Sequence, residues 1–205
     1  MDQFMEIKHE HPGTILFFRM GDFYELFHED AEIAAPVLGL ALTSRDKNAE
    51  HPIPMAGFPW HALEDNLKIM LKSGFRVTVA EQEQELREGA KLLERVVTRI
   101  YTPGSLYEES LLSTDDRSVL CSIILGKSSL SMAIIDSSTG ESWASTWDGD
   151  ARFSSLEDEL LRWNPAEIVI SKKDSENEQL CAIFANLGNC VISQHNANKR
   201  RSVER

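Results

Sequence analysis

Apolar and polar residues along the first half of the chain predict strands and helices in alternation. A short helix is expected over residues 2–8, and the apolar run TILFFRM at 14–20 is typical of a buried strand. Further strands are expected at 40–44, 75–80 and 96–101, with an amphipathic helix at 60–72. The two prolines at 52 and 54 argue against a central strand there. This order predicts an α/β domain with a mixed sheet.

The segment after the first strand has the pattern of a helix that opens at Gly21-Asp22. Asp22 is a good N-cap, and Glu25 three residues later completes a capping-box-like pair. The apolar residues that follow have helical spacing, and Pro36 and Gly39 are expected to end the helix. On this pattern Phe23 would be the first core residue of the helix.

The second half of the chain has a different order of elements. Strands are expected at 119–125, 131–135, 141–146, 168–170 and 191–193, with helices at 156–163 and 176–187. The resulting order βββαβαβ resembles a ribonuclease-H-like domain. A Pro-Gly turn and the polar stretch after it mark a linker at 106–117, between domains at 1–105 and 118–205. The polar end NKRRSVER suggests a cut through a longer protein.

The composition is that of an ordinary globular protein, but the net charge is negative, whereas DNA-binding proteins are usually basic. Apolar residues make up 42% and charged residues 26%, and the net charge is −12. The charge is spread evenly, because residues 1–102 hold 11 basic and 17 acidic residues, and the remainder 10 and 16. Contact with DNA would therefore need a small local basic patch or parts outside this chain.

Cysteine usage and hydropathy exclude several classes. Cys121, Cys181 and Cys190 are odd in number and lack C-x-x-C spacing, which argues against a disulfide framework or a structural zinc site. We expect all three to be buried reduced thiols. The chain has neither a secretory signal nor an apolar run long enough to cross a membrane, so a cytoplasmic location is expected and no membrane partner.

Four ordered motifs in the first half resemble the mismatch-recognition domain of the MutS family. They are FRMGDFYELF at 18–27, LTSR at 42–45, IPMAGFPWHA at 53–62 and RIYTPG at 99–104. The second half is similar to the connector domain of the same family through IDSSTGE at 135–141 and NPAE at 164–167. The resemblance implies a mixed-sheet recognition domain followed by a ribonuclease-H-like connector domain, and a role in recognising mismatched duplex DNA.

The resemblance also implies which side chains meet DNA. In the family a Phe-x-Glu pair enters the minor groove at a mispaired base, and Phe23 and Glu25 match that pair. Met20, Arg45, Met55 and His61 fall in segments that line the DNA in relatives and are possible further contacts. Without the resemblance, each has an ordinary structural explanation. Phe23 and Glu25 suit a helix start, the methionines core packing, Arg45 a solvated surface and His61 a local turn.

The sequence has no G-x-x-x-x-G-K run followed by Ser or Thr, so no nucleotide site can be assigned. The resemblance implies that ATP and Mg²⁺ belong to domains absent from this chain, that dimerisation also uses absent domains, and that the connector domain binds mismatch-repair partner proteins. We expect no cofactor, no enzymatic activity and only weak DNA binding in this chain alone.

Two other functions compete with mismatch recognition. A metal-dependent nuclease would hold Mg²⁺ with strand-borne carboxylates, for which Asp136, Glu141 and Asp174 are the candidates. The alternative for the first two is an ordinary hairpin. The uniformly acidic chain could also be a protein-interaction module.

Overall fold

The computed structural model describes residues 1–45, 51–83, 93–105 and 118–195, in two compact units, Met1–Thr102 (unit 1) and Pro103–Arg205 (unit 2). The linker predicted at 106–117 lies outside the described residues. The predicted α/β class is confirmed, because each unit contains one mixed sheet with helices.

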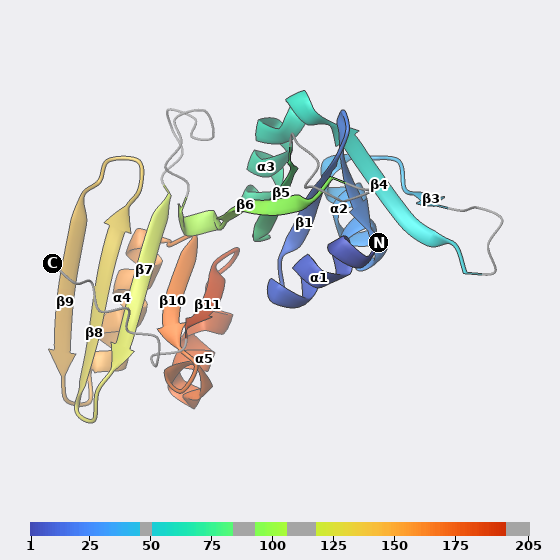
Figure 1. Ribbon diagram of the computed structural model, residues 1–205. Helices are drawn as coiled ribbons and strands as arrows, with labels where there is room; N and C mark the ends of the chain where they lie inside the picture. The colour runs from blue at the N-terminus through green and yellow to red at the C-terminus, as the bar shows by residue number, and fades with distance from the viewer. Residues whose placement is uncertain (46–50, 84–92, 106–117, 196–205) are drawn as a thin grey trace, which may run out of the picture. The chain divides into compact units, whose positions relative to one another are not determined.

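Unit 1 is built on a six-stranded sheet with the order β3-β4-β2-β1-β5-β6 (Figure 1). Strands β1 and β5 pair in parallel, and the other neighbouring strands are antiparallel. The elements of unit 1 are α1 (Asp2–Glu10), β1 (Ile15–Met20), β2 (Phe23–Phe27), α2 (His28–Leu38), β3 (Thr43–Arg45), β4 (Ile53–Pro59), the 3-10 helix η1 (Trp60–Ala62), α3 (Leu63–Lys72), β5 (Val77–Gln82) and β6 (Arg95–Tyr101).

The prediction of a helix that opens at Gly21-Asp22 is wrong for the first seven residues of that helix. Residues 23–27 form β2 in the middle of the sheet, between β1 and β4, and the helix begins only at His28. Gly21 and Asp22 instead form a two-residue turn, with Gly21 at φ 61°. A glycine with positive φ at the first central position is typical of a type II′ hairpin. Two aromatic-rich runs flank this turn, and their strand pairing outweighs the helical spacing.

Helix α1 covers one face of the sheet in unit 1. Phe4 and Ile7 pack in a cluster with strand residues that include Phe18 and Phe27, and Phe4 meets both rings edge-on. Lys8 of α1 forms a 2.8 Å salt bridge with the buried Asp30 of α2. Helices α2 and α3 lie behind the sheet in the view of Figure 1, where α2 packs against β2 and β4.

Two proline predictions need correction. Strand β4 is central, between β3 and β2, although Pro54 lies within it. Pro54 pairs with Ser44 of β3, while the pairing of β4 with β2 reaches only to Met55, so the proline lies where β4 has one partner strand. Pro36 does not end α2, which continues to Leu38. The prediction of Gly39 as its end is confirmed, with φ 66°.

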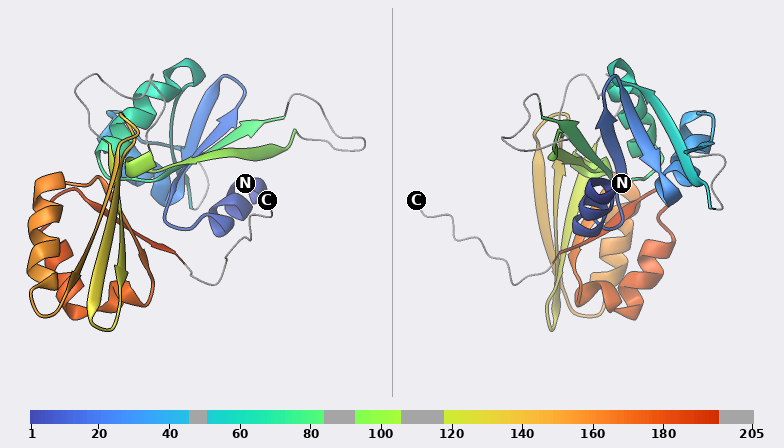
Figure 2. Two further views of the ribbon diagram at one scale, coloured as in Figure 1. Left: turned by 90° about the vertical axis from the view of Figure 1, so that its left-hand side faces the viewer. Right: turned by 45° about the vertical axis from the view of Figure 1, so that its right-hand side comes forward.

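Unit 2 has the predicted order βββαβαβ. Its five-stranded sheet has the order β11-β10-β7-β8-β9, with β10 parallel to both β7 and β11. Helices α4 and α5 lie on one side of this sheet (Figure 2), over a shared apolar core. The elements are η2 (Pro103–Ser105), β7 (Val119–Leu125), β8 (Ser129–Asp136), β9 (Ser142–Asp148), α4 (Arg152–Trp163), β10 (Glu167–Ser171), η3 (Asp174–Glu176), α5 (Glu178–Ala185) and β11 (Val191–His195).

The cysteines of unit 2 are free, but they are not all buried as predicted. Burial raises the pKa of the Cys121 thiol to about 12. Cys190 is half-buried, and burial raises its pKa to about 11. Cys181 is exposed on α5, because its position in the helix points away from the core formed by Leu180 and Ile183. Among the described residues, no helix is long and apolar enough to span a membrane.

Candidate nucleic-acid interface

The β1–β2 hairpin holds an aromatic side chain out toward solvent. Phe23 is the first residue of β2, directly after the Gly21-Asp22 turn, and 46% of its surface is exposed. Its partners in the sheet are Met20 on β1 and Pro59 on β4. The prediction from helical pattern that Phe23 is a core residue is therefore wrong. Single exposed apolar side chains are common on protein surfaces, so this exposure makes the ring accessible but does not by itself assign it a role.

Glu25 lies on the same face of β2 as Phe23, because side chains two residues apart on a strand point to the same side. It is half-buried, opposite Phe18 on β1 and Gly57 on β4. A side chain at position 57 would lie 3.0 Å from the Tyr24 carbonyl oxygen and 3.7 Å from Cγ of Glu25. Gly57 thus leaves the space that the Glu25 side chain occupies. With no helix start at Asp22, the capping role considered for Glu25 is also wrong.

Strand register brings three of the four other predicted contacts onto this face. Met20 is paired with Phe23, and Met55 is paired with Phe27, two residues beyond Glu25. Arg45 lies on the edge strand β3, with its guanidinium 5.8 Å from the centre of the Phe27 ring. The two methionines also pack against the apolar cluster beneath α1, so the core-packing explanation holds for part of their surface.

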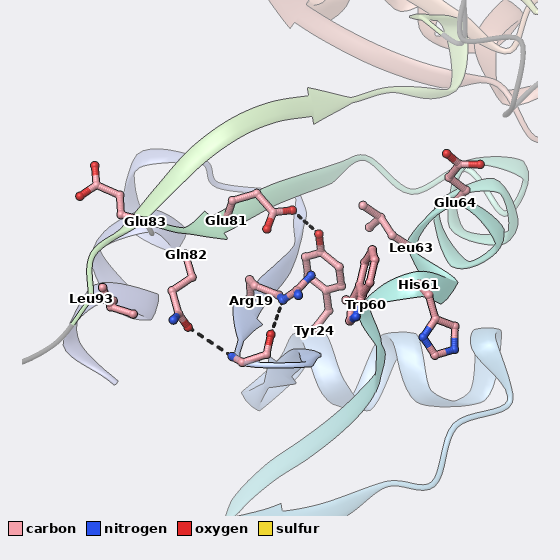
Figure 3. Close-up of a pocket in the computed structure, with 11 residues that line it drawn as sticks. Arg19, Tyr24, Trp60, His61, Leu63, Glu64, Glu81, Gln82, Glu83 and Leu93 are labelled. Carbon is pink, nitrogen blue, oxygen red and sulfur yellow. Dashed lines mark hydrogen bonds between the residues drawn. The ribbon is translucent and has the colours of Figure 1, made fainter. Parts of the chain in front are cut away.

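His61 is not part of this group. It lies exposed in η1 and helps to line a cavity of about 690 Å³ on the opposite side of the hairpin. Arg19 and Tyr24, which lie across from each other on β1 and β2, line the same cavity (Figure 3). Residues at these positions point away from the face that carries Phe23 and Glu25, because neighbours along a strand alternate in direction.

Two arginines act on the charge of Glu25. Burial raises the pKa of the Glu25 carboxyl, and the positive charges of Arg45 and Arg95 oppose that rise. Arg95 is the first residue of β6, and its guanidinium lies 5.4 Å from the centre of the Phe18 ring, which is directly opposite Glu25. Two positive charges therefore lie near Glu25 on this face, although the chain as a whole is strongly acidic.

The carboxylates considered for a nuclease in unit 2 are not brought together. Asp136 is paired with Val119 at the start of β7, whereas Asp174 accepts a hydrogen bond from the Leu125 amide at the end of β7. Six steps along a strand separate these ends by about 20 Å. Asp136 and Glu141 close the β8–β9 hairpin through a backbone hydrogen bond of 2.9 Å. Within the described ranges, no group of three metal-ligating side chains is present.

Comparison with known proteins shows the family of the chain. The family model of MutS domain I matches residues 1–110, and that of MutS domain II matches residues 118–204. The chain belongs to the MutS family. It is 35% identical over 195 residues to the DNA mismatch repair protein MutS of Caldanaerobacter subterraneus subsp. tengcongensis, which covers 95% of this chain and 22% of that protein.

Other MutS proteins give the same result. The protein of Syntrophomonas wolfei is 41% identical over 175 residues, 85% of this chain and 20% of that protein. The protein of Streptococcus suis is 38% identical over 193 residues, 94% of this chain and 22% of that protein. The chain thus spans about a fifth of the length of these MutS relatives.

Sequence reasoning did not find Arg95 as a neighbour of the Phe-x-Glu pair. Arg95 precedes the RIYTPG motif by four residues and is distant from Glu25 in sequence. The two come together because β5 joins β6 to β1 in the sheet, through the Phe18–Ala80 and Ala80–Val97 pairs. No local sequence signal indicated this neighbourhood, because it depends on the order of strands in the sheet.

Proposed function

We propose that this chain recognises mismatched DNA, with Phe23 as a wedge that enters the minor groove and Glu25 as the group that contacts the displaced base. The observation that supports this function best is the exposed Phe23 ring at the tip of a well-paired hairpin, beside a half-buried carboxyl group on the same face. Membership of the MutS family, whose members compared above are named DNA mismatch repair proteins, supports the same proposal.

The energetics of a wedge favour mispaired sites over matched ones. Inserting an apolar ring between base steps costs a few kcal/mol of unstacking in a normal duplex. A mispair has already lost part of its stacking and pairing, so kinking the duplex there costs less. Stacking of Phe23 on one base returns about 1–3 kcal/mol and hardly depends on base identity. The site would therefore sense how easily the duplex deforms and would accept many different mispairs.

Glu25 would make the wedge more selective. Its carboxyl group can accept a hydrogen bond from a ring nitrogen of the base that the wedge displaces. A negative charge so close to the phosphates also penalises close approach to an intact duplex, where no such hydrogen bond compensates. Arg45 at the edge of the same face is suited to a phosphate contact, and Met20 and Met55 would line the groove beside the ring.

The remaining predicted properties depend on parts of MutS proteins outside this chain. We expect the 205-residue chain alone to bind DNA weakly, because it is acidic and its basic patch is small. Dimerisation, and binding of ATP and Mg²⁺, would belong to those other parts. For unit 2 we propose docking of mismatch-repair partner proteins rather than catalysis, which agrees with the separation of Asp136 and Asp174. For His61, which lies in η1 on the cavity side of the sheet, we propose a separate contact with DNA.

A binding titration with Phe23→Ala in the full-length protein tests the proposal. We expect the preference for a duplex with one G·T mispair over a matched duplex to fall by about fivefold or more, since one stacking contact of about 1–3 kcal/mol is lost. The matched control is Trp60→Ala, which removes an aromatic ring of similar exposure, 51%, from η1 on the cavity side of the sheet. That variant should keep its preference.

The melting temperatures of both variants should lie within a few degrees of that of the unsubstituted protein, which shows that the titration compares folded proteins. Unchanged discrimination in Phe23→Ala would refute the wedge. Equal losses in the two variants would show that unit 1 matters as a whole and that Phe23 has no special role.

A further inference from the structure

The turn that carries Phe23 is attached to the sheet in an unusual way on its β5 side. Backbone pairing between β1 and β5 stops at Phe18 and Ala80, so the last residues of β1 and the turn extend past the parallel ladder. On the other side, β2 stays paired with β4 as far as Phe23 and Pro59, and the Trp60 amide donates a 2.9 Å hydrogen bond to the Asp22 carbonyl. One side of the turn is thus held by backbone, and the other needs side chains.

Gln82 provides the attachment on the β5 side. The amide of Gly21 in the turn donates a 3.2 Å hydrogen bond to Oε1 of Gln82, the last residue of β5 (Figure 3). The same oxygen accepts a 3.1 Å hydrogen bond from Nη2 of Arg95, its partner across the β5–β6 pair. Both neighbours are donors, so the carboxamide presents its oxygen to them and is fixed in orientation.

Arg95 in turn links the ends of β1, β5 and β6. Its Nε donates to the Arg19 carbonyl on β1 at 3.2 Å, and its Nη1 donates to the Leu93 carbonyl at 2.7 Å. Its guanidinium also stacks over Phe18, which fixes the plane of the group. With Nη2 on Gln82, every nitrogen of the guanidinium has a defined acceptor. Arg95 therefore holds Gln82 in place and holds the end of β1 as it enters the turn.

From this geometry we propose that Gln82, oriented by Arg95, is a positioning residue for the Phe23 wedge, an inference that rests on the proposed function. Phe23 lies two residues after Gly21. Conformational freedom of the backbone at the Gly21 amide would therefore allow the Phe23 ring to change its direction. A wedge that enters a groove must keep its direction while the duplex bends, because a mobile ring loses conformational entropy on insertion. The hydrogen bond to Gln82 removes that freedom before DNA binds.

The Gln82 side chain contributes little to the core of unit 1. Gln82 is only half-buried and lies at the end of β5, while the buried residues of that strand are Val77, Thr78, Val79 and Ala80. Loss of its carboxamide oxygen should therefore leave the sheet intact and change chiefly the turn. A residue with a purely structural role would lower stability and leave the discrimination of folded protein unchanged.

Two substitutions at this position separate hydrogen bonding from bulk. Gln82→Leu keeps the approximate size and removes the acceptor, whereas Gln82→Glu keeps an oxygen for both Gly21 and Arg95. In the full-length protein we expect Gln82→Leu to lower the preference for a G·T mispair about three- to tenfold, the range given by the net contribution of one hydrogen bond. Gln82→Glu should retain the preference to within about twofold.

Amide hydrogen exchange of Gly21, measured by NMR on the 205-residue chain, gives a readout that needs no DNA. Exchange should accelerate in Gln82→Leu and stay slow in Gln82→Glu. Faster exchange without any loss of discrimination, or unchanged exchange, would overturn the positioning role. Phe23→Ala measured in parallel separates the two proposals. If Phe23→Ala lowers discrimination and Gln82→Leu does not, only the positioning role fails, whereas no effect of Phe23→Ala refutes the wedge itself.

Discussion

The two faces of strand β2 show opposite uses of the same kinds of residue. On one face, Tyr24 is 1% exposed, Leu26 is fully buried, and Phe58 on β4 packs against the Tyr24 ring. On the other face, Phe27 is buried beneath α1, but Phe23 is 46% exposed and Glu25 is half-buried. Phe23 and Tyr24 are neighbours in sequence, yet Tyr24 packs in the core with Phe17 and Phe58 whereas about half of the Phe23 surface meets solvent. Folding accounts for the rings of the first face and for Phe27, whereas the exposed end of the second, open face needs another explanation.

The largest expected effect comes from breaking the buried face. Tyr24→Ala should lower the free energy of unfolding of unit 1 by about 3–5 kcal/mol, because a buried aromatic ring and its contacts are lost. The matched variant Phe23→Ala should change it by less than about 1 kcal/mol, because an exposed ring has little to lose. Urea unfolding followed through NMR signals of unit 1 measures both. Similar losses for the two variants would remove the distinction between the faces.

A smaller effect is expected from the charge of Glu25. Burial raises the pKa of this carboxyl in the free protein, and nearby phosphates would raise it further in a complex. Because the bound state then holds the proton more tightly, binding to mismatched DNA should strengthen as the pH falls toward the pKa of Glu25 in the complex. Glu25→Gln should remove most of this slope, since its amide does not titrate. An equal slope in that variant would assign the effect to another group.

The smallest effect concerns Arg45 at the edge of the open face. Arg45→Ala should weaken binding to matched and mismatched duplexes equally, a few-fold at about 0.15 M salt, because a phosphate contact carries no sequence information. The slope of log binding constant against log salt concentration should fall by about 1. Arg45→Lys keeps the charge and is the control. A selective loss of mismatch binding in Arg45→Ala would place this residue at the base instead.

Much of the fold could be predicted from hydrophobic pattern, and the failures have physical causes. The order of elements in unit 2 was predictable because its apolar runs are short and are separated from one another by turn residues or helical segments. The hairpin of unit 1 was not, because residues 22–34 also fit helical spacing. Strand pairing on both sides of β2 decides the conformation there, and neither partner strand is visible in a local window.

The candidate site was predictable only through family resemblance. Pattern alone predicted Phe23 to be a core residue, whereas the motif match predicted an exposed contact. Met20, Met55 and Arg45 share the face because of strand register, which the motifs do not encode. Gln82 and Arg95 could not be predicted from local sequence, since their role depends on where the β1–β5 ladder stops.

Site-specific photo-cross-linking tests the central claim most directly. The full-length protein would carry a benzoylphenylalanine in place of Phe23, with the same replacement of Trp60 as the control on the cavity side of the sheet. A wedge predicts cross-links from position 23 to the mispaired base or its direct neighbour, far fewer on matched duplex, and none from position 60 to that base. The account would be contradicted if position 23 gave no cross-links, or if it cross-linked equally often to matched and mispaired duplexes.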